Sequence, residues 1–481
     1  MTKFDGEPTK VFGNLINGEW VNSEETFLVE NKYTHEPYAY VAKADDAIVT
    51  QAITNAVKVF KTAKLSTTDR YTILMKAAKL FEERKEELAL IICREAGKTI
   101  TDARGEVDRG IQTFINSAEE AKRIAGQGLP IQGQPGNEGK MAFSIRVPVG
   151  VVCAITPFNF PFNLTAHKVG PAIAAGNTIV LKPAEKTPVS AIKMAEILLE
   201  AGLPAGYLNV VNGYGHEIGP VLLKDERIAM YTFTGSPTVG KVIKSESGIR
   251  KVTLELGSNS PNIIHHDVSD LKRAVKLCVT KGYVNSGQAC ISVQRVYVHS
   301  SIYDEVLRDA KEIADAIVVG NPENDATEVG PMISIQEAQR VEKWVQEAVE
   351  AGARVVTGGI REGSVFRPTI LSDVTEDMKV MCEEVFAPVI SIVPYDDIDR
   401  VFELVNASRF GLQVGFFTSN LHLAMRAAQE LEFGGVNIND VSSFRADILP
   451  YGGVKDSGVG KEGPRSAVEE MTDEKIITMH I

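Results

Sequence analysis

The sequence predicts an α/β fold with two parallel-sheet domains in series, and three observations lead to this expectation. Between residues 144 and 265, short β-rich runs alternate with helical segments of ten or more residues. The same alternation restarts after Asp270, and the chain ends in an apolar, β-like tail at residues 474–481. Strands that alternate with helices of this length form parallel βαβ units. We therefore expect two α/β domains, with a boundary near Glu255 where the pattern restarts.

The first half of the chain is predicted to begin with helices. Residues 45–96 and 105–125 carry apolar side chains at helical spacing among lysines and glutamates. The pattern then changes to β-rich runs, which start with SIRVPVGVVCAITP at residues 144–157. Helical segments at residues 188–204 and 215–225 separate the later runs, as a parallel sheet requires.

The second half repeats this arrangement. Residues 270–290 are predicted to be helical, residues 292–300 to form a strand, and residues 301–320 to be helical again. The later strand candidates are ARVVTGG, FRPTILSDV, VISIVPYDD, LQVGFFTS and GGVNIND. We expect the apolar tail to pair with the sheet edge of another subunit, because an exposed apolar edge invites association.

Composition argues against several classes of function. At 481 residues the chain is too long for one compact core, and its net charge of −12 disfavours nucleic acid as a partner. Residues 1–10 lack the apolar centre of a signal peptide, and the prolines within residues 147–166 disfavour a membrane helix. The five scattered cysteines form no CxxC pair and the histidines form no HExxH motif, so no disulfide framework and no metal site is expected. These features together predict a cytoplasmic protein.

Cys290 is the first candidate for a catalytic residue. It lies in the segment NSGQACISVQR, where Gly287 permits a tight turn and the small Ala289 leaves room beside the thiol. A cysteine near a helix N-terminus has a depressed pKa and reacts as a thiolate, and we expect this environment here. Taken alone, a buried core thiol is the more frequent role for a single cysteine beside strand residues.

Two other residues have chemistry that suits a nucleophilic cysteine. Glu255 ends an apolar β-run, an unfavourable place for a carboxylate without a function, and is a candidate general base; the alternative is a strand-end glutamate that faces solvent. Asn159 lies between two prolines after a buried strand, and its amide is a candidate donor to a developing oxyanion. The alternative for Asn159 is a turn asparagine that caps its own loop.

Two turns that follow strands are candidates for nucleotide binding. Lys182 and Glu185, in LKPAEKTP, stand where a nucleotide ribose can hydrogen-bond with both side chains. Gly235 and Gly240, in FTGSPTVG, flank a strand-to-helix turn whose backbone N–H groups suit a pyrophosphate. This spacing lacks the Lys-Ser/Thr of an ATP-binding loop, and each turn alone is equally compatible with an ordinary β-turn.

No single motif is decisive, but the whole set in this order resembles the aldehyde dehydrogenase superfamily nearly end to end, in its lactaldehyde and semialdehyde dehydrogenase-like branch. The matching segments are PFNFP, KPAE, FTGS, LELGS, GQAC, EEVFAPV and PYGGVKDSG. Glu384 and Phe386 of EEVFAPV, which alone look like a solvated carboxylate and a core aromatic, acquire a role only through this resemblance. Two departures stand out: Ser258 replaces the family's usual glycine, and Phe158 replaces its usual tryptophan.

The resemblance implies an architecture of two Rossmann-like parallel-sheet domains and a β-strand oligomerisation arm. The cofactor-binding domain is expected at residues 1–122 and 148–255, and the catalytic domain at residues 256–456. Residues 123–147 and 464–481 are expected to form the arm and tail, and the implied assembly is a homodimer or homotetramer.

The resemblance also implies the roles of site residues. Cys290 is expected to be the nucleophile and Glu255 the base for thioester hydrolysis. Asn159, with the Cys290 backbone N–H, is expected to form the oxyanion hole, and Lys168 and Glu462 a proton path to the base. The residues expected to bind the dinucleotide are Thr156, Pro157, Phe158, Lys182, Glu185, Gly235, Ser236, Leu256, Gly257, Glu384 and Phe386.

The implied function is NAD(P)-dependent oxidation of an aldehyde to its acid through a cysteine thiohemiacetal and thioester. NAD is expected to be preferred because a carboxylate at Glu185 repels a 2′-phosphate, although Lys182 leaves NADP open. Arg109, Asn163 and Arg445 are expected near the substrate entrance and favour a short anionic or polar aldehyde; the alternative is two surface arginines. Two other functions stay open, a coenzyme A-acylating aldehyde dehydrogenase and a non-catalytic nucleotide-binding protein on the same fold.

Overall fold

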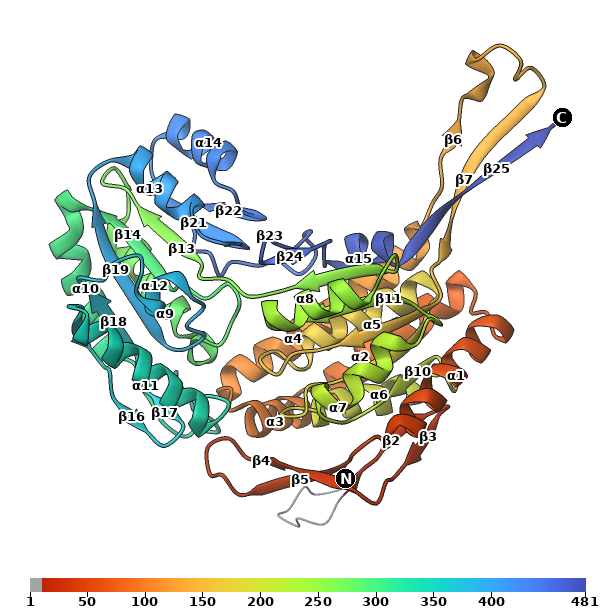
Figure 1. Cartoon of the computed structure of the whole chain (residues 1–481), viewed down its shortest axis with the longest axis horizontal. Helices are drawn as coiled ribbons and strands as arrows, with labels where there is room; N and C mark the ends of the chain where they lie inside the picture. Colours follow the sequence, from red (N-terminus) through yellow and green to blue (C-terminus); the bar gives the residue numbers. More distant parts are fainter. Residues whose placement is uncertain (1–10) are drawn as a thin grey trace.

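The computed structural model describes residues 11–481. The polar segment of residues 1–10, on which the expectation of no signal peptide rests, lies outside the described residues. Two sheets with helices on both faces lie side by side, and a narrow strand arm projects from the first of them (Figure 1). The α/β fold class predicted from the sequence is confirmed.

The first sheet has eight strands in the order β24-β12-β11-β8-β9-β10-β2-β3. Its five central strands are parallel, and the edge strands pair antiparallel. The strands are β24 (Gly458–Val459), β12 (Lys251–Glu255), β11 (Ile228–Thr234), β8 (Val151–Ile155), β9 (Thr178–Lys182), β10 (Leu208–Val210), β2 (Asn14–Ile16) and β3 (Glu19–Val21).

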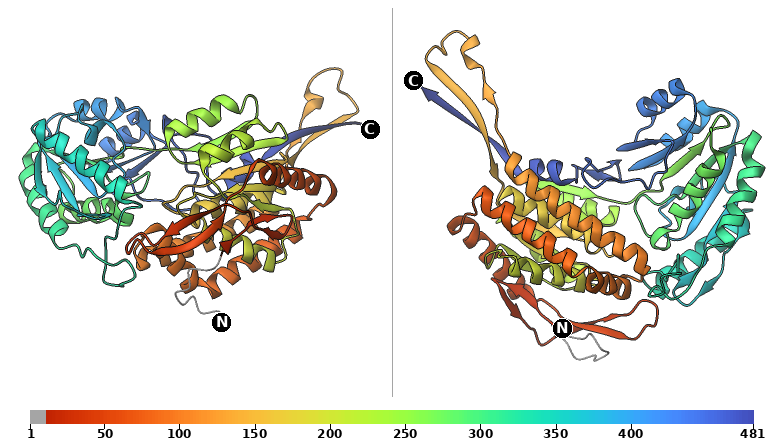
Figure 2. Two further views of the ribbon diagram at one scale, coloured as in Figure 1. Left: turned by 60° about the horizontal axis from the view of Figure 1, so that its bottom comes forward. Right: turned by 180° about the vertical axis from the view of Figure 1, so that it is seen from behind.

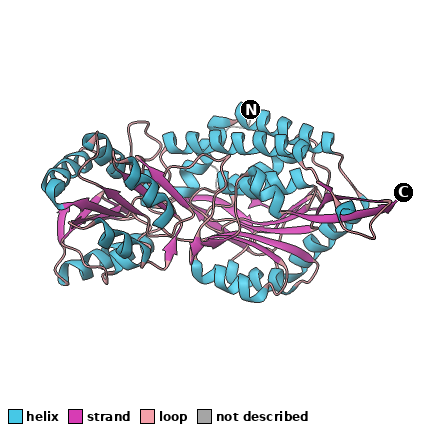
Figure 3. Cartoon of the chain, turned by 90° about the horizontal axis from the view of Figure 1, so that it is seen from above, coloured by secondary structure: helices cyan, strands magenta, loops and turns pink. Residues whose placement is uncertain are grey.

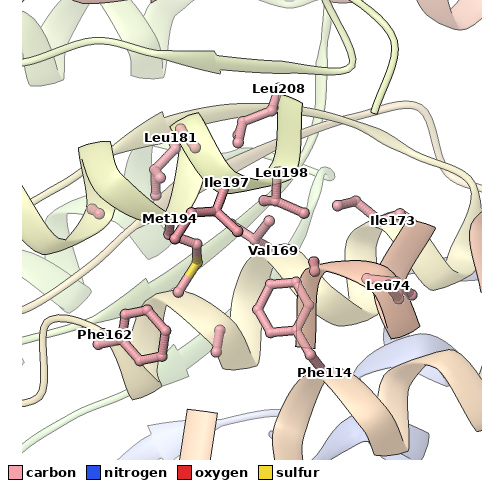
Figure 4. Packing of buried hydrophobic residues seen from close by; sticks show 14 of the residues in the cluster. Leu74, Phe114, Phe162, Val169, Ile173, Leu181, Met194, Ile197, Leu198 and Leu208 are labelled. Atoms are coloured by element: carbon pink, nitrogen blue, oxygen red, sulfur yellow. The ribbon is translucent and has the colours of Figure 1, made fainter. Parts of the chain in front are cut away.

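Helices cover both faces of this sheet because its strands are apolar on both sides. In β8, Val152 and Ala154 join one core cluster, while Val151 and Cys153 join the other. The first cluster packs against α2 (Thr67–Glu83), α3 (Lys85–Ala96), α4 (Ile100–Arg123), α5 (Asn163–Ala175) and α6 (Val189–Glu200). The second packs against α1 (Asp46–Thr62), α7 (Gly215–Lys224) and α8 (Pro237–Glu246). Figure 4 shows Phe114 of α4 and Val169 of α5 among the residues of the first cluster.

The second sheet has seven strands in the order β15-β18-β19-β14-β13-β21-β22 and is parallel apart from β15. The strands are β15 (Arg354–Thr357), β18 (Thr369–Ser372), β19 (Val389–Tyr395), β14 (Arg295–His299), β13 (Pro261–Ile264), β21 (Gln413–Phe417) and β22 (Gly435–Ile438). One face packs against α9 (Leu271–Gly282) and α10 (Tyr303–Asp315). The other packs against α11 (Ile335–Glu350), α12 (Lys379–Cys382), α13 (Ile398–Asn406) and α14 (Leu421–Glu430).

The arm is a three-stranded antiparallel sheet in the order β25-β7-β6, and it extends away from the helices (Figures 1 and 2). Its strands are β25 (Thr472–His480), β7 (Lys140–Pro148) and β6 (Gly128–Leu129), so the predicted apolar tail is a strand. Residues 464–470, which the sequence analysis grouped with the tail, form helix α15 (Pro464–Glu470) instead. Val468 of this helix belongs to the first core cluster.

One small sheet and two strand pairs complete the fold. A small sheet in the order β1-β5-β4 is built from β1 (Val11–Phe12), β5 (Pro37–Ala42) and β4 (Thr26–Glu30). Two further pairs are β16 (Arg361–Glu362) with β17 (Val365–Phe366), and β20 (Phe410–Gly411) with β23 (Val454–Lys455). Within residues 11–481, no helix combines the length and apolar character needed to cross a membrane.

The chain crosses between the two sheets more than once, and these crossings meet where the sheets adjoin (Figure 3). Residues 256–260 lead from β12 in the first sheet to β13 in the second. Later, β24 returns to the first sheet and pairs with β12, with Glu255 opposite Gly458. Residues that are far apart in the sequence are therefore brought together between the sheets.

Candidate active site

The site lies at the carboxyl ends of the parallel strands of the first sheet, where open α/β sheets bind their ligands. Thr156 follows β8, Lys182 ends β9, Gly235 follows β11, and Leu256 follows β12. These four strands are neighbours in the sheet, so residues predicted from separate motifs meet at one edge. The second sheet contributes the loop that carries Cys290, just before β14.

The loop of Cys290 is held in an unusual conformation. The predicted helix over residues 270–290 ends at Gly282, and Asn285 and Ser286 then have φ values of 53° and 54°. A Cβ atom on Gly287 would lie 2.0 Å from the Ala387 carbonyl oxygen, so only glycine fits there. These constraints hold Cys290 half-buried, ahead of a strand.

The expectation that Cys290 lies near a helix N-terminus with a depressed pKa is wrong. No helix begins at this point, and burial raises the pKa of the Cys290 thiol to about 11. The sulfur lies 3.0 Å from the Tyr451 hydroxyl oxygen. The local groups that favour the thiolate are therefore side chains: this hydroxyl and the Arg445 guanidinium.

Asn159 is buried beside the same loop. Its Nδ2 donates to the Gln288 carbonyl over 2.9 Å, and Asn285 Nδ2 donates to the Asn159 carbonyl over 3.1 Å. An amide nitrogen carries two N–H groups, so the bond to Gln288 leaves one of them for a substrate oxygen. On the other side, Glu106 Oε1 accepts from the Phe162 backbone N–H over 2.9 Å and so fixes the end of the loop.

Glu255 is buried at the end of β12, and neither of its carboxyl oxygens has a hydrogen-bond partner among the described residues. Burial, followed by the nearby Glu462 carboxylate, raises the pKa of Glu255 well above its usual value. A Cβ atom on Gly452 would lie 2.8 Å from Glu255 Oε1, so this glycine leaves the room that the carboxyl occupies. A buried carboxyl without a structural partner has the environment expected of a catalytic base.

Lys168 and Glu462 form a buried ion pair behind Glu255. Lys168 Nζ lies 2.7 Å from Glu462 Oε1, and Arg445 Nη2 lies 3.2 Å from Glu462 Oε2. Although burial opposes ionisation, Lys168 and Arg445 hold the pKa of Glu462 at about 2. The pKa values of the two neighbouring carboxyls are thus shifted in opposite directions: Glu462 is ionised, whereas Glu255 keeps its proton to a higher pH.

The three residues predicted at the substrate entrance share one partner, Asp447. Arg109 binds it through two bonds of 2.8 Å, and Asn163 Nδ2 lies 3.3 Å from Asp447 Oδ1. Arg445 Nε lies 3.5 Å from the same oxygen, and His167 Nε2 lies 2.8 Å from it. The structure therefore brings both arginines together, but around a carboxylate of the chain itself. Arg109 is about one-third exposed at its side chain, whereas Arg445 is buried.

The predicted cofactor residues fit a dinucleotide. Lys182 Nζ lies 3.0 Å from Glu185 Oε2 at the end of β9, and Ser236 is the exposed N-cap of the ten-residue helix α8. A helix N-terminus after a strand suits a pyrophosphate. A side chain on Gly257 would collide with Glu384, whose Oε1 accepts from the Ser258 backbone N–H over 2.9 Å.

Glu384 and Phe386 come from the second sheet's side of the site. Burial raises the pKa of Glu384 to about 7, so it can both donate and accept near neutral pH. Phe386 has a φ of 53°, a strained conformation for an aromatic residue, and its ring lies edge-on to Phe158 at 5.8 Å. Ser258, which departs from the family pattern, still supplies the backbone N–H that holds Glu384. No group of three or more His, Cys, Asp or Glu side chains within residues 11–481 is arranged to hold a metal ion.

The sequence analysis missed three residues of this site: His167, Asp447 and Tyr451. His167 follows Asn163 by one helical turn of α5, and Tyr451 stands in the PYGG motif, so both had a local signal. Asp447 lies in a loop and is recognisable only from its contacts with α4 and α5.

Comparison with known proteins identifies the family of the chain. Residues 20–477 match the model of the aldehyde dehydrogenase family. The chain is 52% identical over 472 residues to a 3-sulfolactaldehyde dehydrogenase of Priestia aryabhattai, covering 98% of both chains. It is 40% identical over 469 residues to a lactaldehyde dehydrogenase of Methanocaldococcus jannaschii, covering 96% of this chain and 99% of that one.

Solved structures agree as well. Aldehyde dehydrogenase 21 from Physcomitrella patens, in complex with the product succinate, is 38% identical with a TM-score of 0.95 and covers 98% of both chains. A glyceraldehyde-3-phosphate dehydrogenase from Methanocaldococcus jannaschii, complexed with NADP, is 40% identical with a TM-score of 0.92 and covers 96% of this chain and 100% of that one. The chain thus belongs to the aldehyde dehydrogenase family and is an NAD(P)-dependent enzyme.

Proposed function

We propose that the enzyme oxidises a short, anionic or polar aldehyde to its carboxylic acid through a thiohemiacetal and a thioester on Cys290. One observation carries this proposal: Asn159 is hydrogen-bonded to the loop of Cys290, while the unpartnered carboxyl of Glu255 lies in the same buried cluster. A nucleophile, an oxyanion donor and a base are the three groups that acyl transfer to water requires.

The residues divide the reaction between them. The Cys290 thiolate attacks the aldehyde carbon, and the free N–H of the Asn159 amide stabilises the oxyanion that forms. The predicted residues at the carboxyl edge of the first sheet, with Glu384 and Phe386 from the second sheet's side, would hold a nicotinamide dinucleotide, which would supply the hydride acceptor. Glu255 then takes a proton from water, which attacks the thioester carbon; the carbon–sulfur bond breaks, and the acid and the Cys290 thiolate are released. The raised pKa of Glu255 makes its carboxylate a stronger base for this step.

The charges around Asp447 support an anionic substrate. Three cations, Arg109, Arg445 and Lys168, face two carboxylates, Asp447 and Glu462. Neighbouring cations lower the pKa of both carboxylates, which are therefore ionised. The three cations exceed these two carboxylates by one charge as long as Glu255 and Cys290, which lie in the same cluster, keep their protons. The similar proteins named above act on 3-sulfolactaldehyde and lactaldehyde or hold succinate, which are short and polar or anionic.

Arg109→Ala tests the substrate class. We expect KM for 3-sulfolactaldehyde or succinate semialdehyde to rise at least about tenfold, since a hydrogen bond to a charged group contributes roughly 1.5–3 kcal/mol. KM for propanal should change little. Arg109 is the better probe, because Arg445 also contacts Glu462 and stacks 3.7 Å above the Tyr451 ring.

A matched control is Arg227→Ala, which removes another arginine that binds an aspartate, the partly buried Asp225, through Nε and Nη2. It should leave both KM values unchanged. If hexanal or benzaldehyde gives a higher kcat/KM than every anionic aldehyde, the proposed substrate class is wrong.

The preference for NAD over NADP remains part of this proposal. The Glu185 carboxylate can accept from a ribose 2′-hydroxyl and repels a 2′-phosphate, while its bond to Lys182 occupies the cation that would otherwise bind the phosphate. We expect a higher kcat/KM with NAD, and we expect Glu185→Ala to shift the ratio toward NADP by about tenfold. A wild-type enzyme that is more efficient with NADP would contradict this assignment.

We also propose that the arm pairs with a second subunit, giving a homodimer or a dimer of dimers. The arm exposes apolar side chains along its length, namely Met141, Ile145, Ile476, Met479 and Ile481. Strand β25 is the edge of its sheet, so one row of its backbone groups can pair with another chain. Light scattering at micromolar concentration should give at least twice the 52.3 kDa chain mass, and a monomeric mass would refute the proposal.

A further inference from the structure

The hydroxyl group of Tyr451 is placed directly against the sulfur of Cys290. Tyr451 Oη lies 3.0 Å from Cys290 Sγ, and no other hydrogen bond to this sulfur is formed within residues 11–481. The contact is buried, because Tyr451 is 4% exposed and packs with Ile291 and Leu412 around the cysteine. Water therefore has limited access to this side of the sulfur.

The position of Tyr451 is fixed from two sides. Its backbone N–H donates to the Glu462 carbonyl over 3.0 Å, and the Glu462 N–H donates back over 2.7 Å. The Arg445 guanidinium lies 3.7 Å from the centre of the Tyr451 ring. A cation above an aromatic ring is attracted to its π electrons, and this withdrawal of charge makes the phenolic O–H a stronger donor.

The direction of the hydrogen bond follows from the acidities of the two groups. Burial raises the pKa of the Cys290 thiol to about 11, and burial together with the Cys290 charge raises the pKa of Tyr451 well above its usual value. A thiol is ordinarily more acidic than a phenol, with a pKa of about 8.5 against about 10, and burial raises both, so the sulfur ionises first. The tyrosine keeps its proton and can donate it in a hydrogen bond to the thiolate.

We propose that Tyr451 is a catalytic residue whose hydroxyl activates Cys290 by donating a hydrogen bond to its thiolate. This proposal rests on the assignment of Cys290 as the nucleophile. No proton is transferred from the tyrosine; the hydroxyl raises the fraction of Cys290 that is ionised. A thiolate stabilised in this way is also less nucleophilic, by about threefold for each tenfold gain in ionised fraction, so the net gain below the thiol pKa is about threefold for each pKa unit.

Tyr451→Phe tests the proposal, because it removes the hydroxyl and keeps the ring beneath Arg445. The readout is the rate at which iodoacetamide alkylates Cys290 in the absence of substrate, followed by mass spectrometry of the peptide because the exposed Cys382 also reacts. We expect the inflection of the pH profile to move up by about one unit and the rate at neutral pH to fall about threefold. Tyr451→His, which restores a donor, should recover part of the rate.

Tyr395→Phe is the matched control, since it removes another buried tyrosine hydroxyl, one bonded to His265 at the far end of β19. Its alkylation profile should equal that of the wild type. An unchanged profile in Tyr451→Phe would overturn the role of Tyr451 and leave Cys290 as the nucleophile. The assignment of Cys290 as the nucleophile is tested separately: it is wrong if the Cys290→Ala enzyme still turns over aldehyde.

Discussion

Cys290→Ala should abolish aldehyde oxidation, with a loss on the order of 10⁴-fold or more, while binding of NAD stays near the wild-type level. The loss is large because, in the proposed mechanism, the thiohemiacetal and thioester both form on this sulfur, and removal of a covalent nucleophile eliminates the pathway itself. Binding persists because most of the predicted dinucleotide residues lie at the carboxyl edge of the first sheet, and the two from the second sheet's side, Glu384 and Phe386, belong to a different segment from Cys290. The measurements are nicotinamide absorbance for turnover and calorimetric titration for binding.

Cys382→Ala is the control for the loss of a thiol. Cys382 is exposed at the end of α12, and its removal should leave turnover unchanged. Substantial oxidation by the purified Cys290→Ala protein would refute the covalent mechanism. Loss of NAD binding together with turnover would instead indicate that the substitution disturbs the fold of the site.

Glu255→Gln has the second-largest expected effect and separates the two halves of the reaction. Hydride removal does not need the base, but hydrolysis of the thioester does, so NADH should appear in a burst about equal to the number of active sites. Steady-state turnover should then fall by about 10²–10⁴-fold, the usual contribution of a general base. Rapid mixing with absorbance detection measures both phases.

The pH dependence of the slow phase gives an independent check. Burial beside Glu462 raises the pKa of Glu255, so the ionised base is absent at low pH and wild-type deacylation should increase as the pH rises through that pKa. The Glu255→Gln enzyme has no such group and should lose this dependence. An unchanged steady-state rate in the variant would remove Glu255 from the mechanism.

Two additions make the experiment on Glu255 more specific. Glu95→Gln changes another buried carboxyl, which accepts from the Val189 and Ser190 backbone N–H groups, and it should show no burst. Coenzyme A should not accelerate the slow phase of Glu255→Gln if water is the natural acceptor. Acceleration by coenzyme A would favour the acylating branch of the family.

The layered fold could be predicted from the sequence because its signals are local. Apolar strands alternate with amphipathic helices, and this period is readable within ten to twenty residues. The helix predicted to reach Cys290 was wrong because Asn285 and Ser286 adopt positive φ, a conformation that Gly287 continues and that helical periodicity does not reveal. The resulting half-buried thiol has a raised pKa where a lowered one was expected.

The site could be predicted where a motif carries the function, and not where contacts between distant segments decide it. Glu255 and Asn159 stand in recognisable segments, and the structure connects both to the cysteine loop. Asp447 follows Arg445 by two residues but pairs with Arg109 across 338 positions of the sequence, so nothing local indicated that one carboxylate contacts both entrance arginines. Because the sequence analysis did not include Asp447, it predicted that both arginines are free to contact a substrate.

The division of the site between two sheets has a consequence for how the enzyme loses function under stress. The first sheet carries Asn159 and Glu255, and the second carries Cys290; residues 256–260 join β12 of the first sheet to β13 of the second. A displacement of about 1 Å between reacting groups can reduce a rate about 100-fold. A small displacement of one sheet relative to the other should therefore strongly reduce the catalytic rate, although every helix and strand remains folded. In heated or denaturant-treated samples, the catalytic rate should therefore respond to a shift between the two sheets before any spectroscopic measure of secondary structure does.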